Sequence, residues 1–217
     1  NANLLSELGK EHEVRAFNFT RQYPSFLFPG KTQYVTAEDE AVPVESMALL
    51  DTANPFTWRK TAREIAKWQP DVLIMRYWMS YFAPSLGSVS RKMPKGCVRI
   101  GILDNVVPHE PHFFDAPLTR WYLKSLDGAV TLCDEVAQDL MALRKDIPHT
   151  TIPHPTYTHF GEAISKSEAE DMLGIPHVEG SRTLLFFGLI REYKGLDVLI
   201  RAMRLLDPRY RLIIAGE

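Results

Sequence analysis

Apolar residues along the chain fall into two alternating patterns, short continuous runs and stretches with helical spacing. The continuous runs predict strands at 13–19, 72–76, 98–104, 129–133, 150–152, 183–187 and 211–215. The helical spacing predicts helices at 2–9, around 58–66, 118–125 and 136–143, after 165 and at 196–203. Buried strands that alternate with amphipathic helices are typical of a parallel sheet with helices on both faces. The predicted fold class is therefore α/β.

Helix ends carry recognisable signals. Pro70 stops the helix around 58–66. Asp134 is expected to cap the helix at 136–143. Ser165-x-x-Glu168 is a capping box, and Gly174 is suited to end the helix that it opens.

The pattern divides the chain into two domains of unequal length. Residues 1–158 contain most of one α/β domain. Residues 159–181 form a connector to a second domain, of which residues 182–217 supply one strand–helix–strand unit. The chain opens inside a helix and closes directly after a strand. We therefore expect a fragment that lacks the first strand and most of the second domain, and that is inactive on its own.

Composition excludes several classes of protein. The 25 Lys and Arg residues against 27 Asp and Glu leave a net charge of −2, without the basic surplus of a dedicated nucleic-acid binder. The longest apolar runs fall far short of the ~20 residues that span a membrane. Cys97 and Cys133 give no zinc spacing and no disulfide framework, so we expect two reduced, buried thiols in a cytosolic protein.

Ligands of open parallel sheets bind at the carboxyl ends of strands, where this sequence places polar clusters at 20–23, 76–78, 104–110 and 191–195. In the last cluster a strand runs into Gly188, and Arg191 and Lys194 precede a helix that begins near Gly195. A helix N-terminus and two cations favour an anion, so the segment predicts a phosphate or diphosphate site. The alternative is a connecting loop with two solvated charges. Neither a P-loop nor a G-x-G-x-x-G motif is present.

Several segments resemble one family of enzymes. The run Phe187-Gly188…Arg191…Lys194-Gly195-Leu196-Asp197 and the closing segment 213–217 resemble the donor-domain opening of the large retaining glycosyltransferase family of the GT-B fold, family 4 of that classification. A bacterial subgroup of this family is similar at four further places, which follow in the expected order: 18–24, 28–32, 104–110 with Asp115, and 154–157.

The resemblance implies a GT-B fold, with two Rossmann-like parallel-sheet domains of which the second is truncated here. The first domain would bind a glycan or lipid-linked acceptor, and the second a nucleotide-sugar donor. Transfer would proceed with retention, without metal or other cofactor and without nucleic acid. The implied setting is surface or extracellular polysaccharide synthesis in the bacterial cytoplasm, with peripheral association at the inner face of the membrane.

The resemblance also implies roles for residues of both domains. Gly188, Arg191 and Lys194 would bind the donor diphosphate, although the family arginine usually follows the glycine directly, where this chain has Leu189. The predicted catalytic residues of the first domain are His109, Glu110 and Arg76, and the predicted acceptor-binding residues are Asp104, Asn105, Tyr77 and Trp78.

The residues predicted for the site of the first domain allow more than one role. Many relatives carry a histidine where this chain has Arg76, which cannot act as a base but can bind phosphate or an anionic acceptor. His109 and Glu110 would deprotonate or orient an acceptor hydroxyl, or would form a structural pair. A metal site from His109, His112 and Asp115 needs ligands that converge, which a proline-containing loop does not assure. The aromatic side chains would stack on sugars or pack in the core.

Two other functions compete with the enzyme. A non-catalytic sugar- or nucleotide-binding module of the same fold would share these motifs. A doubly wound dehydrogenase or epimerase is disfavoured, because no glycine fingerprint follows a predicted strand.

Overall fold

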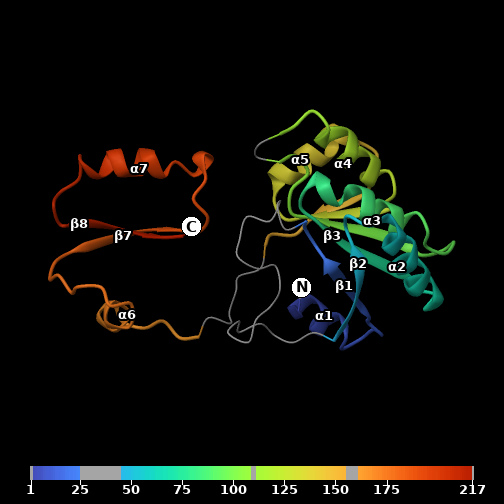
Figure 1. Cartoon of the computed structure of the whole chain (residues 1–217), viewed down its shortest axis with the longest axis horizontal. Helices are drawn as coiled ribbons and strands as arrows, with labels where there is room; N and C mark the ends of the chain where they lie inside the picture. Colours follow the sequence, from blue (N-terminus) through green and yellow to red (C-terminus); the bar gives the residue numbers. More distant parts are fainter. Residues whose placement is uncertain (1, 25–44, 109–110, 155–160, 217) are drawn as a thin grey trace. The chain divides into compact units, whose positions relative to one another are not determined.

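The computed structural model describes residues 2–24, 45–108, 111–154 and 161–216 (Figure 1). The chain forms two compact units, Asn1–Pro155 and Thr156–Glu217, close to the predicted end of the first domain at residue 158. Every strand pair among the described residues is parallel, which confirms the α/β class. No helix in the described part of the chain combines the length and apolar character that crossing a bilayer requires.

Unit 1 contains two parallel sheets with their connecting helices. A two-stranded sheet pairs β1 with β2, and a four-stranded sheet has the order β3-β4-β5-β6. The elements are α1 (Ala2–Leu8), β1 (Ala16–Arg21), β2 (Ser46–Asp51), α2 (Pro55–Lys67), β3 (Val72–Tyr77), the short 3-10 helix η2 (Ser80–Phe82), α3 (Ala83–Ser90), β4 (Val98–Leu103), α4 (Asp115–Leu123), β5 (Gly128–Thr131), α5 (Asp134–Leu143) and β6 (His149–Thr151).

The register of the four-stranded sheet aligns the carboxyl ends of its strands. β3 and β4 pair without a shift from Val72–Val98 to Tyr77–Leu103. Because both strands end at the same level, the residues that follow them meet at one edge of the sheet. This carboxyl edge is where we look for a site.

A shared apolar core ties the two sheets of unit 1 together. The ring of Phe19, on β1, lies 6.4 Å from Trp78 and 5.7 Å from Phe82, which both follow β3. Helix α2 begins at the N-cap Asn54, whose side chain accepts a hydrogen bond from the Phe56 backbone, and buries Ile65. Aromatic contacts therefore fix the end of β1 beside the end of β3.

Three elements of unit 1 were not predicted, namely β2, the short 3-10 helix η2 and α3. The strand β2 carries no strong alternation of apolar and polar residues, and only Leu50 is buried. The helix α3 has the sequence APSLGSVS, in which small residues face a crowded interior. A Cβ added at Gly87 would lie 2.3 Å from the Trp121 ring on α4. Tertiary packing rather than apolar periodicity therefore defines α3.

Three local predictions need correction. Asp134 is the first residue of α5 rather than its cap, because Cys133 occupies the N-cap position and no side chain bonds there. Cys133 is exposed, and only Cys97 is buried. One face of the four-stranded sheet is less covered than predicted, since Val72, Ile74 and Val98 are 42–45 % exposed, while Met75 and Tyr77 belong to the same buried cluster as residues of α3 and α4.

Unit 2 consists of a parallel strand pair with three short helical segments. They are α6 (Lys166–Met172), β7 (Arg182–Phe187), the 3-10 helix η3 (Glu192–Lys194), α7 (Leu196–Met203) and β8 (Tyr210–Ala215). The predicted capping box is confirmed, with Ser165 and Glu168 bonded reciprocally. Helix α6 packs through its buried Glu170, which accepts a hydrogen bond from Arg211 on β8 and pairs with His177 at 2.6 Å.

Candidate functional site

The carboxyl ends of β3 and β4 bring Arg76 and Asp104 together. The Arg76 guanidinium donates from Nε to Asp104 Oδ2 at 2.7 Å and from Nη2 to Oδ1 at 2.8 Å. This is a bidentate pair, and the two side chains keep 31 % and 20 % of their surface exposed. The separate roles predicted for Arg76 and Asp104 are therefore revised to one hydrogen-bonded unit, in which the carboxylate balances the guanidinium charge.

A second pair of the same kind lies at the ends of β1 and β2. Arg21 donates from Nε to Asp51 Oδ1 at 3.0 Å and from Nη2 to Oδ2 at 2.7 Å. Asp51 Oδ1 also accepts from the Ala53 backbone at 2.9 Å. Sequence reasoning singled out the cluster that contains Arg21 and missed Asp51. The available signal was an acidic residue at the end of an apolar run, but that run was not recognised as a strand.

An aromatic cluster, made of Tyr23, Trp78, Tyr81 and Phe82, lies at the same ends of β1 and β3. Trp78 Nε1 donates to the Tyr23 hydroxyl at 2.8 Å, and the Tyr23 and Tyr81 rings stack at 6.0 Å. Burial raises the pKa of Tyr23, against the lowering effect of the Trp78 hydrogen bond. The Tyr23 hydroxyl therefore stays neutral at physiological pH. Trp78 is half-buried, so the predicted ligand contact is compatible with its position.

Tyr77 does not belong to this surface. Its side chain has no exposed area, its ring stacks on Tyr122 at 4.5 Å, and its hydroxyl shares a 2.8 Å hydrogen bond with Thr119. A fully buried ring offers no face to a sugar. The predicted acceptor contact of Tyr77 is therefore replaced by a role in the core.

The loop after β4 holds the remaining predicted residues of unit 1. Asn105 is partly exposed next to Asp104, whereas His109 and Glu110 lie outside the described residues. Asp115 is buried at the start of α4, where it accepts hydrogen bonds from the Ser80 hydroxyl and from the His112 backbone at 2.6 Å. The His112 Nδ1 atom lies 3.4 Å from the same carboxylate. Within the described ranges, no three potential metal ligands gather.

In unit 2 the side-chain ammonium of Lys194 lies next to Gly188, the residue that follows β7. A Cβ added at Gly188 would lie 3.1 Å from Lys194 Nζ, and the Gly188 φ angle of 111° is one that other residues rarely adopt. The turn η3 and Gly195, with φ at 65°, fold the loop back so that the ammonium reaches the strand end. Arg191 opens this turn and is exposed, and no carboxylate pairs with it among the described residues. The structure thus brings Gly188 and Lys194 together, with Arg191 on the same loop.

The N-terminus of α7 contributes less to anion binding than the sequence suggested. Asp197 lies in its first turn, accepts a hydrogen bond from Arg201 at 2.5 Å, and is bonded to the Val198 backbone N–H. These contacts lower the pKa of Asp197, the Arg201 bond most. Because the chain's own carboxylate occupies this helix end, the attraction for an anion rests on Lys194 and Arg191.

Both units therefore present polar side chains where parallel strands end, which is where α/β proteins of this class bind ligands. No protein-family model and no curated protein matches the chain.

Proposed function

We propose that the chain is part of a retaining glycosyltransferase, which moves a sugar from a nucleotide-sugar donor to a glycan or lipid-linked acceptor. The resemblance of its segments to the GT-B family supplies the reaction. The observation that carries the proposal is the position of the Lys194 ammonium next to Gly188, on a loop that also carries Arg191, for which the described residues supply no carboxylate partner. Two cations at a strand end suit the diphosphate of a nucleotide sugar.

The chemistry explains why these cations matter. In the transfer, the bond from the sugar carbon to the diphosphate breaks, and the new bond to the acceptor oxygen forms on the same face of the sugar. The diphosphate gains negative charge as it leaves. Positive groups fixed nearby before the reaction stabilise that charge more than the ground state, so they raise the rate as well as the affinity.

Unit 1 supports the acceptor half of the proposal. The Arg76–Asp104 and Arg21–Asp51 pairs orient carboxylate oxygens at the carboxyl ends of strands in the two sheets of unit 1, and carboxylates accept hydrogen bonds from sugar hydroxyls. Tyr23, Trp78 and Tyr81 of the aromatic cluster are partly exposed there, and aromatic rings of this kind stack on sugar rings. Asn105, His109 and Glu110 complete the proposed acceptor side. The nucleotide-sugar donor places the reaction in the cytoplasm, and a lipid-linked acceptor places it at the inner face of the membrane.

Titration of the chain with uridine and guanosine diphosphates tests the donor half. We expect Lys194→Ala to weaken binding about tenfold or more, because a hydrogen bond to a charged group is lost. Arg204→Ala is the matched control, since Arg204 is an exposed cation at the other end of α7. Equal affinity in the original chain and in the Lys194→Ala and Arg191→Ala variants would place the donor elsewhere.

Transfer assays on the enzyme that carries this chain separate the two candidate functions. We expect Lys194→Ala to lower kcat/KM by roughly 10²–10³-fold, and Lys194→Arg to restore only part of it because the two cations differ in shape. Nucleoside diphosphate binding without any sugar transfer would instead favour the non-catalytic module.

A further inference from the structure

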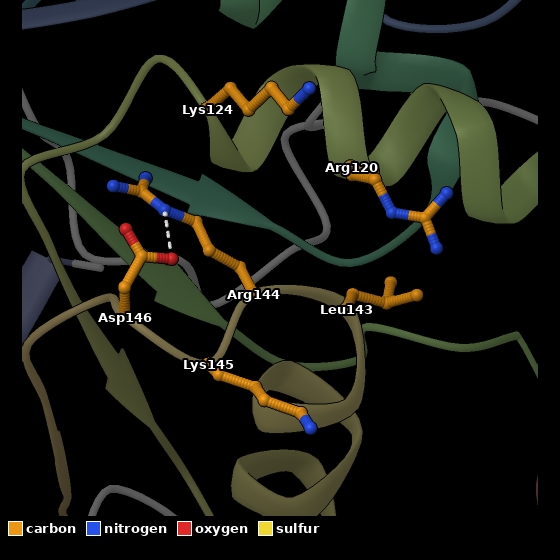
Figure 2. Close-up of a pocket in the computed structure, with 6 residues that line it drawn as sticks. All are labelled: Arg120, Lys124, Leu143, Arg144, Lys145 and Asp146. Atoms are coloured by element: carbon orange, nitrogen blue, oxygen red, sulfur yellow. Dashed lines mark ion pairs between the residues drawn. The ribbon is translucent and has the colours of Figure 1, made fainter.

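A basic depression of about 310 Å³ lies between the C-terminal ends of α4 and α5 (Figure 2). Its lining consists of Arg120, Lys124, Leu143, Arg144, Lys145 and Asp146. Both helices lead into the next strand of the sheet, α4 into β5 and α5 into β6. The depression therefore lies at the amino edge of the sheet, opposite the edge with the Arg76–Asp104 pair.

Arg144 forms a fixed part of this depression. Its Nη1 donates to the carbonyl oxygens of Leu123 and of Leu126, the latter at 2.9 Å, just after the last turn of α4. Its Nε atom lies 3.6 Å from an Asp146 carboxylate oxygen, the ion pair drawn in Figure 2. The Arg144 side chain is only 19 % exposed, so this guanidinium is held in place before any ligand arrives.

The other three cations are not balanced in this way. Arg120, Lys124 and Lys145 are exposed, and in the described part of the chain none of them has a carboxylate partner. Four cationic side chains and a single carboxylate thus line the depression, on a chain whose net charge is −2. Helix C-termini favour nearby cations, but Arg144 already bonds the carbonyls there. The positive charge of the other three side chains has no carboxylate to balance it in the ranges that the structure describes.

We propose that this basic depression binds a phosphate-bearing anion. A phosphate carries several charged oxygens, and the guanidinium and ammonium groups that line the depression are the side chains that bind such oxygens. The anion is either a soluble polyphosphate or the headgroup of an anionic lipid, because both present the same group. The depression contains no residue that the proposed glycosyl transfer uses, so the proposal of an anion site does not depend on that function.

Titration with inorganic pyrophosphate tests the site, using the chain with Arg191→Ala and Lys194→Ala so that the loop after β7 does not compete. We expect Lys124→Gln with Lys145→Gln to weaken binding about tenfold, roughly threefold for each surface cation. Lys92→Gln with Lys95→Gln is the matched control, because it removes two exposed lysines from the segment between α3 and β4. The control should change affinity by less than about twofold.

Sedimentation with vesicles of phosphatidylcholine, with and without phosphatidylglycerol, distinguishes the two sources of phosphate. Pyrophosphate binding that the lysine pair weakens assigns the site to a soluble anion. Binding only to the anionic vesicles, lost in the same variant, assigns it to a lipid headgroup. Binding of neither probe, or an equal loss in the control pair, overturns the proposal. Circular dichroism verifies that each variant is folded.

Discussion

Two stacked tyrosines in the core of unit 1 differ by one hydrogen bond. The Tyr77 hydroxyl bonds Thr119 at 2.8 Å, whereas the buried Tyr122 hydroxyl has no partner among the described residues. A buried polar group without a partner costs about 1–3 kcal/mol, while a satisfied one contributes about 1 kcal/mol. The same chemical change at these two positions should therefore act in opposite directions.

We expect Tyr122→Phe to leave the free energy of unfolding unchanged or to raise it by about 1 kcal/mol. Tyr77→Phe should lower it by about 1 kcal/mol, since the Thr119 hydroxyl is left alone. Urea unfolding of both variants measures the difference. A larger loss in Tyr122→Phe than in Tyr77→Phe would show that the Tyr122 hydroxyl has a partner after all.

The same two residues predict a pH dependence. Burial raises the pKa of Tyr77 and that of Tyr122 above the ordinary value. Their contribution to stability is therefore complete below about pH 10, where unfolded tyrosine is neutral, and is lost as the pH rises further. We expect the free energy of unfolding to fall by up to about 1.4 kcal/mol per pH unit for each tyrosine. Unfolding curves on both sides of this pH should show a smaller loss in Tyr122→Phe.

At the scale of elements, close contact between α3 and α4 depends on a glycine. A Cβ at Gly87 would overlap the Trp121 ring, over which the Arg91 guanidinium stacks at 3.8 Å. Alanine favours helix by about 1 kcal/mol over glycine, so helix propensity alone predicts stabilisation. The rigid indole on one side and the arginine on the other leave little room to accommodate a methyl group.

We expect Gly87→Ala to lower the free energy of unfolding by about 1–3 kcal/mol, the usual cost of overpacking. Ser88→Ala on the same helix is the control and should change it by less than about 0.5 kcal/mol. Thermal unfolding of both variants measures the two values. Stabilisation by Gly87→Ala would mean that α4 shifts freely away from α3.

At the scale of the whole molecule, the two units differ in the amount of apolar surface they bury. Every fully buried apolar residue of the described chain lies in unit 1, between Leu50 and Ile147. In unit 2 the large side chains Leu185 and Phe187 are 62 % and 80 % exposed, and α7 has no buried residue. Because apolar burial is the main stabilising contribution, the units should differ in stability.

We expect backbone amides of β7 and β8 to exchange hydrogen for deuterium faster than those of β3, β4 and β5. Exchange measured by mass spectrometry or NMR on the whole chain tests this, since it reports local opening in each strand. Equal protection in both units, lost at one denaturant concentration, would mean that the chain unfolds as one cooperative body.

Local patterns in the sequence accounted for most of the elements and for one part of the candidate site. Runs such as 183–187 and the Ser165–Glu168 capping box are encoded within a few consecutive residues, and the structure has them as predicted. The turn from Gly188 to Gly195 was likewise visible, because two glycines and two cations flank a strand end. Helix α3 was not predicted, because its small residues give little periodic variation in hydrophobicity.

The sequence by itself determined a parallel α/β protein and placed its polar clusters where the strands end. Only the tertiary structure decided which of those residues bind one another. Arg76 and Asp104 are 28 residues apart, and their pairing depends on the register of β3 and β4. Arg76 and Tyr77 are consecutive on β3, so their side chains point to opposite faces, and the packing of other elements decides that the face with Tyr77 is the buried one. Contacts between distant segments set these outcomes, and no local pattern of residues encodes them.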